Sequence, residues 1–150
     1  MQSQCENIYK TARKHAGLTQ NEASELLFIS PRTLSEYENG RLIPPDDVVA
    51  KMVEVYKTPW LAYQHLQSSS MLGQKYLPEL DFLDLSAAVV KLRKELNDVE
   101  RLNDAIFEIA SDGEINEEER ITWDRVIKEI REMISASLAL CFTNTYKDGA

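Results

Sequence analysis

The chain has 150 residues, which is enough for one domain of ordinary size or two small ones. Hydrophobic residues make up 43% of the sequence, and this share excludes an intrinsically disordered chain. The longest apolar stretch, residues 138–142, is far too short to span a bilayer, and the start of the chain lacks the basic and apolar segments of a signal peptide. We therefore expect a cytoplasmic protein in which Cys5 and Cys141 are reduced thiols.

The formal net charge of −8 is distributed unevenly along the chain. Residues 1–70 hold seven Lys or Arg and eight Asp or Glu, whereas residues 71–150 hold ten and seventeen. Such an asymmetry indicates two modules with different partners. The serines at 68–70, followed by Gly73 and Pro78, interrupt two helical patterns. We therefore expect a domain at residues 1–67, a linker at 68–83 and a second domain at 84–142.

Five short helices are expected in residues 1–67. The first covers residues 6–15, and Thr19 with Glu22 forms a capping box at the start of the second. Ser30 caps the third helix, which has a proline at its first position. The fourth and fifth helices are expected to begin after Pro45 and at a cap formed by Thr58. The apolar residues of the five helices lie within 8–12, 23–27, 34–37, 48–56 and 60–66.

A further pattern lies in the segments Leu18-Thr19-Gln20 and Tyr37-Glu38-Asn39-Gly40-Arg41, with Glu22 and Leu34 between them. At this spacing, residues 1–67 resemble the lambda-repressor and Cro-like (XRE) family of helix-turn-helix proteins. The resemblance implies an all-α fold with a five-helix DNA-binding domain, and double-stranded DNA as the partner. It also implies a structural ion pair between Arg13 and Glu38, which ties the first helix to the third.

The resemblance places the DNA-contacting residues on the second and third helices and just after the third. Gln20 matches a glutamine that touches a phosphate and braces the third helix, and Asn39 and Arg41 match phosphate-contacting positions. The full expected set is Thr19, Gln20, Ser30, Pro31, Arg32, Ser35, Glu36, Asn39 and Arg41.

The residues of the third helix have the chemistry that base reading needs. The N-terminal end of such a helix meets base edges in the major groove, and the fork of Arg32 matches guanine O6 and N7. Glu36 fits a cytosine amine, or it repels phosphates and so sharpens specificity. Pro31 stands where the family often has a polar reader, which leaves only apolar contact at that position. Arg32 and Glu36 also fit ordinary solvated surface charges.

The turn between the second and third helices departs from the family at one residue. Phe28 stands where this turn usually has a glycine. A positive φ is costly for a phenylalanine. We therefore expect the turn, and with it the pose of the third helix, to differ from the family pattern.

The C-terminal half is expected to form a long helical hairpin. Residues 85–109 carry apolar side chains at steps of three and four, which predicts one amphipathic helix of about 37 Å. Residues 111–114 form a turn, after which Asn116 caps a second helix that begins with the acidic residues 117–119. The two helices are expected to run antiparallel.

Neither a calcium-binding loop nor an enzyme active site is expected in this sequence. Residues 108–119 partly match a calcium-binding EF-hand loop, but Glu108 and Ala110 occupy positions where the loop needs short oxygen ligands. A capped turn explains the same residues. His15 and His65 fit ordinary surface positions, and no nucleophile, base, metal set or phosphate-binding loop can be assembled around them. We therefore expect no enzyme activity, no cofactor and no metal site.

The two helices of one hairpin cannot by themselves bury the broad apolar faces (stripes) that they carry. The simplest solution is a symmetric homodimer in which two hairpins form a four-helix bundle. The alternative is a monomer in which the stripes pack against the N-terminal domain. The expected dimerisation residues are Leu92, Leu96, Val99, Ile127, Ile130 and Ile134.

Two functions from different classes fit these features. The first is a DNA-binding transcriptional regulator, a dimeric repressor of the phage or prophage type, whose acidic half lies away from DNA. The second is a helix-turn-helix module that binds another protein, such as an antitoxin or an anti-repressor. In either case the acidic half is also available for docking a regulatory protein, and no membrane is involved.

Overall fold

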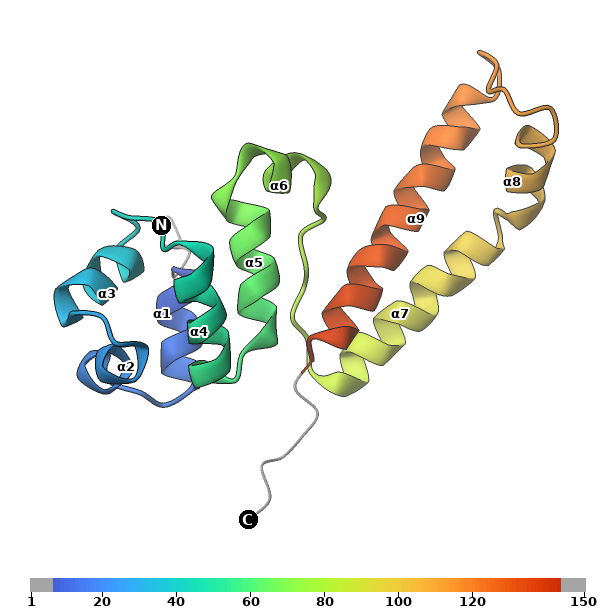
Figure 1. Ribbon diagram of the computed structural model, residues 1–150. Coiled ribbons are helices and arrows are strands. Elements are labelled where there is room, and N and C mark those ends of the chain that lie inside the picture. The colour runs from blue at the N-terminus through green and yellow to red at the C-terminus, as the bar shows by residue number, and fades with distance from the viewer. Residues whose placement is uncertain (1–6, 144–150) are drawn as a thin grey trace, which may run out of the picture. The chain divides into compact units, whose positions relative to one another are not determined.

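The computed structural model describes residues 7–143, and every regular element in that range is a helix (Figure 1). The expected all-α fold is therefore confirmed. The chain divides into two compact units, residues 1–77 (unit 1) and residues 78–150 (unit 2). Cys5 and Glu6 lie outside the described residues, and Cys141 is an exposed free cysteine. Within the described range, a helix with the length and apolarity needed to cross a membrane is absent.

Unit 1 contains α1 (Ile8–His15), α2 (Gln20–Leu27), α3 (Pro31–Glu38), α4 (Asp46–Tyr56), α5 (Pro59–Ser69) and α6 (Met71–Tyr76). Its first five helices enclose one core, in which Leu34, Met52 and Leu61 are fully buried. Burial of a side chain of this size contributes about 1.5–3 kcal/mol. The inner face of α3 is therefore anchored through Leu34, which fixes where its outer face lies. The core is completed by Tyr9, Ala12, Ala23, Leu27, Tyr37, Val49 and Tyr56.

Two helices of unit 1, α2 and α3, begin at the capping residues expected from the sequence. The Thr19 hydroxyl accepts from the Glu22 amide, and the Glu22 carboxylate accepts from the Thr19 amide at 2.8 Å. At the start of α3 the Ser30 hydroxyl accepts from the Thr33 amide at 3.0 Å. Thr58 differs from the expectation, because it precedes α5 without capping it and its hydroxyl is buried with no hydrogen-bond partner.

The expectation that Phe28 would change the turn between α2 and α3 is wrong. Phe28 adopts the left-handed conformation, with φ 57°, that a glycine usually supplies. The turn is closed by two hydrogen bonds, from the Phe28 amide to the Glu25 carbonyl and from the Ile29 amide to the Ser24 carbonyl. These bonds have the pattern of a Schellman motif. Phe28 is 83% exposed, so its side chain lies at the surface and outside the core.

Residues 68–83, where a linker is expected, include the end of α5 and all of α6. Ser70 acts as a cap there, because its hydroxyl accepts from the Gly73 amide at 2.9 Å. A Cβ atom on Gly73 would collide with the Leu66 carbonyl, so the glycine permits the close approach of α6 to α5. The serines therefore mark a sharp turn between two helices, and α6 belongs to unit 1.

His65 is a buried residue of unit 1, which corrects its expected surface position. Its ring is only 3% exposed. Nδ1 lies 2.8 Å from the Tyr9 hydroxyl, and Nε2 lies 3.0 Å from Asp46 Oδ1. The histidine therefore joins α1, α4 and α5 through a buried contact with Tyr9 and a contact with the exposed Asp46.

Unit 2 contains α7 (Leu85–Glu100), α8 (Asn103–Ile109) and α9 (Arg120–Cys141). Figure 1 shows α9 returning alongside α7, as expected for a helical hairpin. The expected single helix over residues 85–109 is wrong, because the chain turns at Arg101 and Leu102. The Leu102 amide bonds to the Val99 carbonyl, three residues back, which tightens this turn. The turn lets both Leu102 and Ile109 face inward, with 8% and 5% of their surface exposed.

The second helix of the hairpin begins later than expected, at Arg120. Asn116 still acts as a cap, because its side-chain oxygen accepts from the amides of Glu118 and Glu119 at 2.9 and 3.0 Å. The Glu119 carboxylate in turn accepts from the Asn116 amide at 3.0 Å. The capping pair therefore stabilises one separate turn just ahead of α9.

Candidate DNA-binding surface

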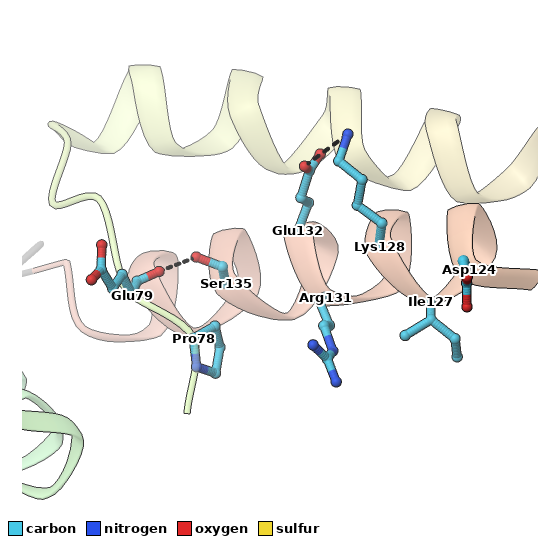
Figure 2. Close-up of a pocket in the computed structure, with 8 residues that line it drawn as sticks. All are labelled: Pro78, Glu79, Asp124, Ile127, Lys128, Arg131, Glu132 and Ser135. Atoms are coloured by element: carbon cyan, nitrogen blue, oxygen red, sulfur yellow. Dashed lines mark hydrogen bonds and ion pairs between the residues drawn. The ribbon is translucent and has the colours of Figure 1, made fainter. Parts of the chain in front are cut away.

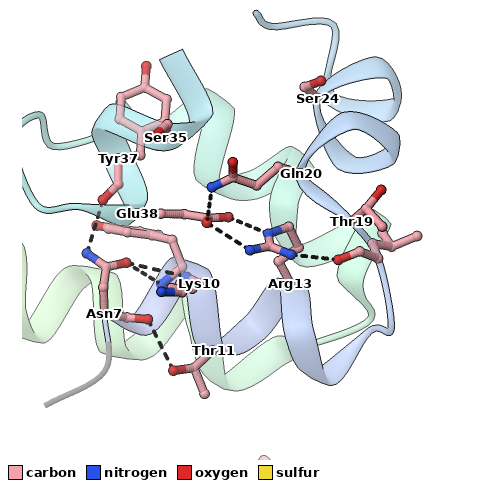
Figure 3. A network of polar contacts seen from close by, with 12 residues as sticks. Asn7, Lys10, Thr11, Arg13, Thr19, Gln20, Ser24, Ser35, Tyr37 and Glu38 are labelled. Carbon is pink, nitrogen blue, oxygen red and sulfur yellow. Dashed lines mark hydrogen bonds and ion pairs between the residues drawn. The ribbon is translucent and has the colours of Figure 1, made fainter. Parts of the chain in front are cut away.

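A buried polar network fixes α3 against α1 and α2 (Figure 3). Arg13 Nε donates to Glu38 Oε1 at 2.5 Å, and Arg13 Nη2 donates to Glu38 Oε2 at 2.9 Å. Gln20 Nε2 donates to the same Oε2 at 2.8 Å, and Arg13 Nη1 donates to the Leu18 carbonyl. The hydrogen bond to Glu38 raises the pKa of Arg13 above its usual range. The buried carboxylate thus has a donor from each of the two other helices.

Asn7 provides a second connection to α3, which was not predicted from the sequence. Its side-chain oxygen caps α1, and its Nδ2 donates to the Tyr37 carbonyl at 3.0 Å. Asparagine is a common N-cap, so the first role has a sequence signal. The second role depends on the packing of α1 against the end of α3, for which the sequence carries no local signal.

The inner and outer faces of α3 are clearly separated. Leu34, Tyr37 and Glu38 are buried, whereas Pro31 and Arg32 in the first turn are exposed. Arg32 is therefore exposed at the N-terminal end of a helix whose opposite face is anchored in the core. This is the arrangement that a recognition helix requires.

Two pairs of expected DNA contacts lie at the end of α3. Arg41 Nη1 lies 3.3 Å from Glu36 Oε1, with 70% of the arginine side chain exposed. Asn39 Nδ2 donates to Ser35 Oγ at 3.1 Å. Exposed ion pairs contribute little stability, about 0–1 kcal/mol. The Arg41 guanidinium can therefore leave Glu36 for another anion at little cost.

Thr19 and Ser30, two of the expected DNA-contacting residues, already act as the N-caps of α2 and α3. Thr19 and Ser30 are exposed, and their hydroxyl oxygens accept from Glu22 and Thr33 amides. The Thr19 hydroxyl also donates to the Glu22 carboxylate at 2.7 Å. This hydrogen bond lowers the pKa of Glu22 and so holds a negative charge at the start of α2. Thr19 therefore uses both its hydroxyl oxygen and its hydroxyl proton within the chain.

Residues 10–61 match the family model described as Helix-turn-helix. Unit 1 contains a helix-turn-helix domain of the XRE type. The match includes the Arg13–Glu38 pair and every expected DNA-contacting residue. Comparison with curated proteins and with solved structures finds no match to the chain.

The matched residues are similar to a family of DNA-binding helix-turn-helix regulators, and the two helices of that motif are α2 and α3. Residues 78–143 lie outside the match. The domain carries the exposed Arg32 and Arg41, whereas most of the excess acid of the chain lies after residue 70. Most of the excess negative charge of the chain thus lies outside the helix-turn-helix domain.

Proposed function

We propose that this chain is a sequence-specific transcriptional regulator, a repressor of the phage or prophage type, that reads DNA with α3 and acts as a homodimer. The observation that carries the proposal is the fixed pose of α3. Its inner face is anchored by Leu34 and by the Glu38 network, while Arg32 is exposed at its N-terminal end. Pre-organisation of this kind lowers the entropic cost of binding.

The proposed division of labour follows from the chemistry of the exposed side chains. Arg32 reads a guanine through two hydrogen bonds. Arg41 moves from Glu36 to a phosphate, which leaves the Glu36 carboxylate free to accept from a cytosine amine. Gln20 and Asn39 position the helix on the backbone. Pro31 makes apolar contact only, for which a thymine methyl group is the natural partner.

The proposed dimer interface is the apolar surface that unit 2 leaves uncovered. Leu85, Val89 and Leu96 are spaced by four and seven residues on α7, so they share one helical face, and they are 46–48% exposed. On α9, Ile134 is 41% exposed. A second copy of the chain would cover both strips in a four-helix bundle. The other expected dimerisation residues, Leu92, Val99, Ile127 and Ile130, are half-buried within one chain and would complete the bundle core.

The experiment that tests this function is selection of bound duplexes from a random DNA pool by the full-length chain. We expect recovery of one sequence with two related half-sites about one helical turn apart. Binding to that duplex should weaken steeply as salt rises, since phosphate contacts release counterions. If no duplex is enriched even at low salt, the helix-turn-helix domain serves another partner, and the antitoxin or anti-repressor alternative replaces this proposal.

A further inference from the structure

Three carboxylates from two helices meet inside unit 2. Glu95 lies on α7, and Glu129 and Glu132 lie on α9. Each offers one oxygen, and these three oxygens lie within 4.8 Å of one another. Oxygen ligands bind divalent cations at about 2.0–2.6 Å, so oxygens on opposite sides of one ion are separated by about 4–5 Å. The spacing therefore fits a single ion held between the helices.

The buried carboxylate of the group is incompletely paired. Glu95 is only 4% exposed, and its Oε2 is buried without a hydrogen-bond partner. Its other oxygen accepts from Lys94 Nζ at 3.2 Å. A buried carboxylate oxygen that lacks a partner is costly, and two further carboxylates beside it add repulsion. A bound cation would remove both costs at once.

The lysines near the group do not supply this missing partner. Lys94 is shared between Glu95 Oε1 and Asp98, and Lys128 Nζ lies 3.5 Å from Glu132 Oε1. Figure 2 shows the Glu132 and Lys128 side chains extending from α9 toward α7. About two thirds of each lysine side chain is exposed, so either ammonium can withdraw to solvent at little cost. Glu95, by contrast, is enclosed between the helices.

We propose that Glu95, Glu129 and Glu132 form a binding site for one hard divalent cation, of the Mg²⁺, Mn²⁺ or Ca²⁺ class, that ties α7 to α9. An all-carboxylate set suits these ions, whereas zinc and copper favour nitrogen or sulfur ligands. Water would complete the coordination of the ion, since three carboxylates leave part of its shell open. The site lies wholly in unit 2 and does not depend on the proposed DNA-binding function.

Direct binding of Mn²⁺ to the full-length chain tests the site. Electron paramagnetic resonance measures free Mn²⁺, because the signal broadens when the ion is bound. We expect one Mn²⁺ per chain for the parent and at least tenfold weaker binding for Glu95→Gln. Glu100→Gln, which removes an exposed carboxylate from the same helix, is the matched control and should bind like the parent. Absence of uptake by the parent at millimolar Mn²⁺, or equal uptake by Glu95→Gln, would overturn the proposal.

Thermal unfolding gives a second test, in which the order of stability of the parent and Glu95→Gln reverses when Mn²⁺ is added. In a chelating buffer we expect Glu95→Gln to unfold at a higher temperature than the parent, because the variant removes a buried charge with one unpartnered oxygen and its amide can donate to Glu129 or Glu132. With Mn²⁺ present the order should reverse, since only the parent gains stability by binding. If Glu95→Gln fails to fold, the half-buried Glu129→Gln tests the same loss of Mn²⁺ stabilisation. A parent whose unfolding temperature is unchanged by Mn²⁺ contradicts the proposal.

Discussion

The Arg13 guanidinium and the Glu38 carboxylate are joined by two hydrogen bonds, and both residues are more than nine-tenths buried. Loss of either partner alone leaves the other charge buried and unpaired. We therefore expect Arg13→Met or Glu38→Leu to lower the free energy of unfolding by about 3–5 kcal/mol. The double variant should recover much of this loss, because it leaves neither charge behind. Urea unfolding of the three variants measures both effects, and single variants that cost under about 1 kcal/mol would show that the pair does not anchor α3.

The turn between α2 and α3 offers a test of backbone strain at Phe28. Lys51 Nζ lies 4.1 Å from the centroid of the exposed Phe28 ring, a cation–π contact that contributes about 0.5–1 kcal/mol at exposed sites. Phe28→Gly loses this contact but relieves the left-handed backbone, so its free energy of unfolding should change by less than about 1 kcal/mol. Phe28→Val keeps the strain and adds a β-branch, so it should be less stable than Phe28→Gly by about 1–2 kcal/mol. Equal stability of the two variants would contradict the left-handed turn.

Alkaline pH should destabilise unit 1 through its buried tyrosines. Burial raises the pKa of Tyr9 to about 12, and burial also raises the pKa of Tyr56 and Tyr63. The folded chain therefore holds these protons more tightly than the unfolded chain, whose tyrosines titrate near 10. The contribution of these protonated tyrosines to the free energy of unfolding is intact below pH 10 and is lost as pH rises from about 10 to about 12.

Phenolate absorbance, recorded beside unfolding curves, measures this effect. Tyr9→Phe should reduce the alkaline loss and, because its hydroxyl contacts His65, should also cost about 1 kcal/mol at neutral pH. The exposed Tyr76→Phe is the control and should change neither quantity. A folded chain in which all tyrosines titrate together near pH 10, with no change in stability, would refute the prediction.

The proposed dimer predicts that a suitable variant folds normally but does not dimerise. Leu96 is 46% exposed within one chain, so Leu96→Glu should leave the single chain folded but place a charge inside the proposed bundle. We expect this variant to sediment as a monomer and to lose about 10²–10⁴-fold in apparent DNA affinity, because the second half-site is no longer engaged at high effective concentration. Asn97→Glu adds the same charge at the next, exposed residue and should remain dimeric. A parent chain that itself sediments as a monomer would rule out this interface.

Local sequence signals predicted the parts of the fold that are closed by local hydrogen bonds. Thr19, Ser30 and Asn116 each accept a hydrogen bond from a backbone amide two or three residues further along the chain. Short segments of the sequence are therefore enough to predict these caps. The missed features depend on residues that are distant in the sequence. His65 is buried because Tyr9 and Asp46 pair with its two ring nitrogens.

The break between α7 and α8 has a similar origin, because it depends on what the hairpin buries. Helical periodicity alone favours continuation through Arg101, whereas the turn places both Leu102 and Ile109 inside. The contact of Glu95 with two acids of α9 is likewise set by the register between the helices. At Phe28 the residue type argued against the observed turn, and backbone hydrogen bonds prevailed over the steric preference.

DNA binding by α3 is tested most directly by titrating Arg32→Ala and Arg41→Ala against the selected duplex and an unrelated duplex over a range of salt concentrations. Arg32→Ala should lose about 1–3 kcal/mol on the selected duplex and relax the preference at one base step, with little change on the unrelated duplex. Arg41→Ala should weaken binding to both duplexes about equally and lower the salt slope by about one. If both variants bind the two duplexes as the parent does, α3 is not the element of this protein that reads DNA.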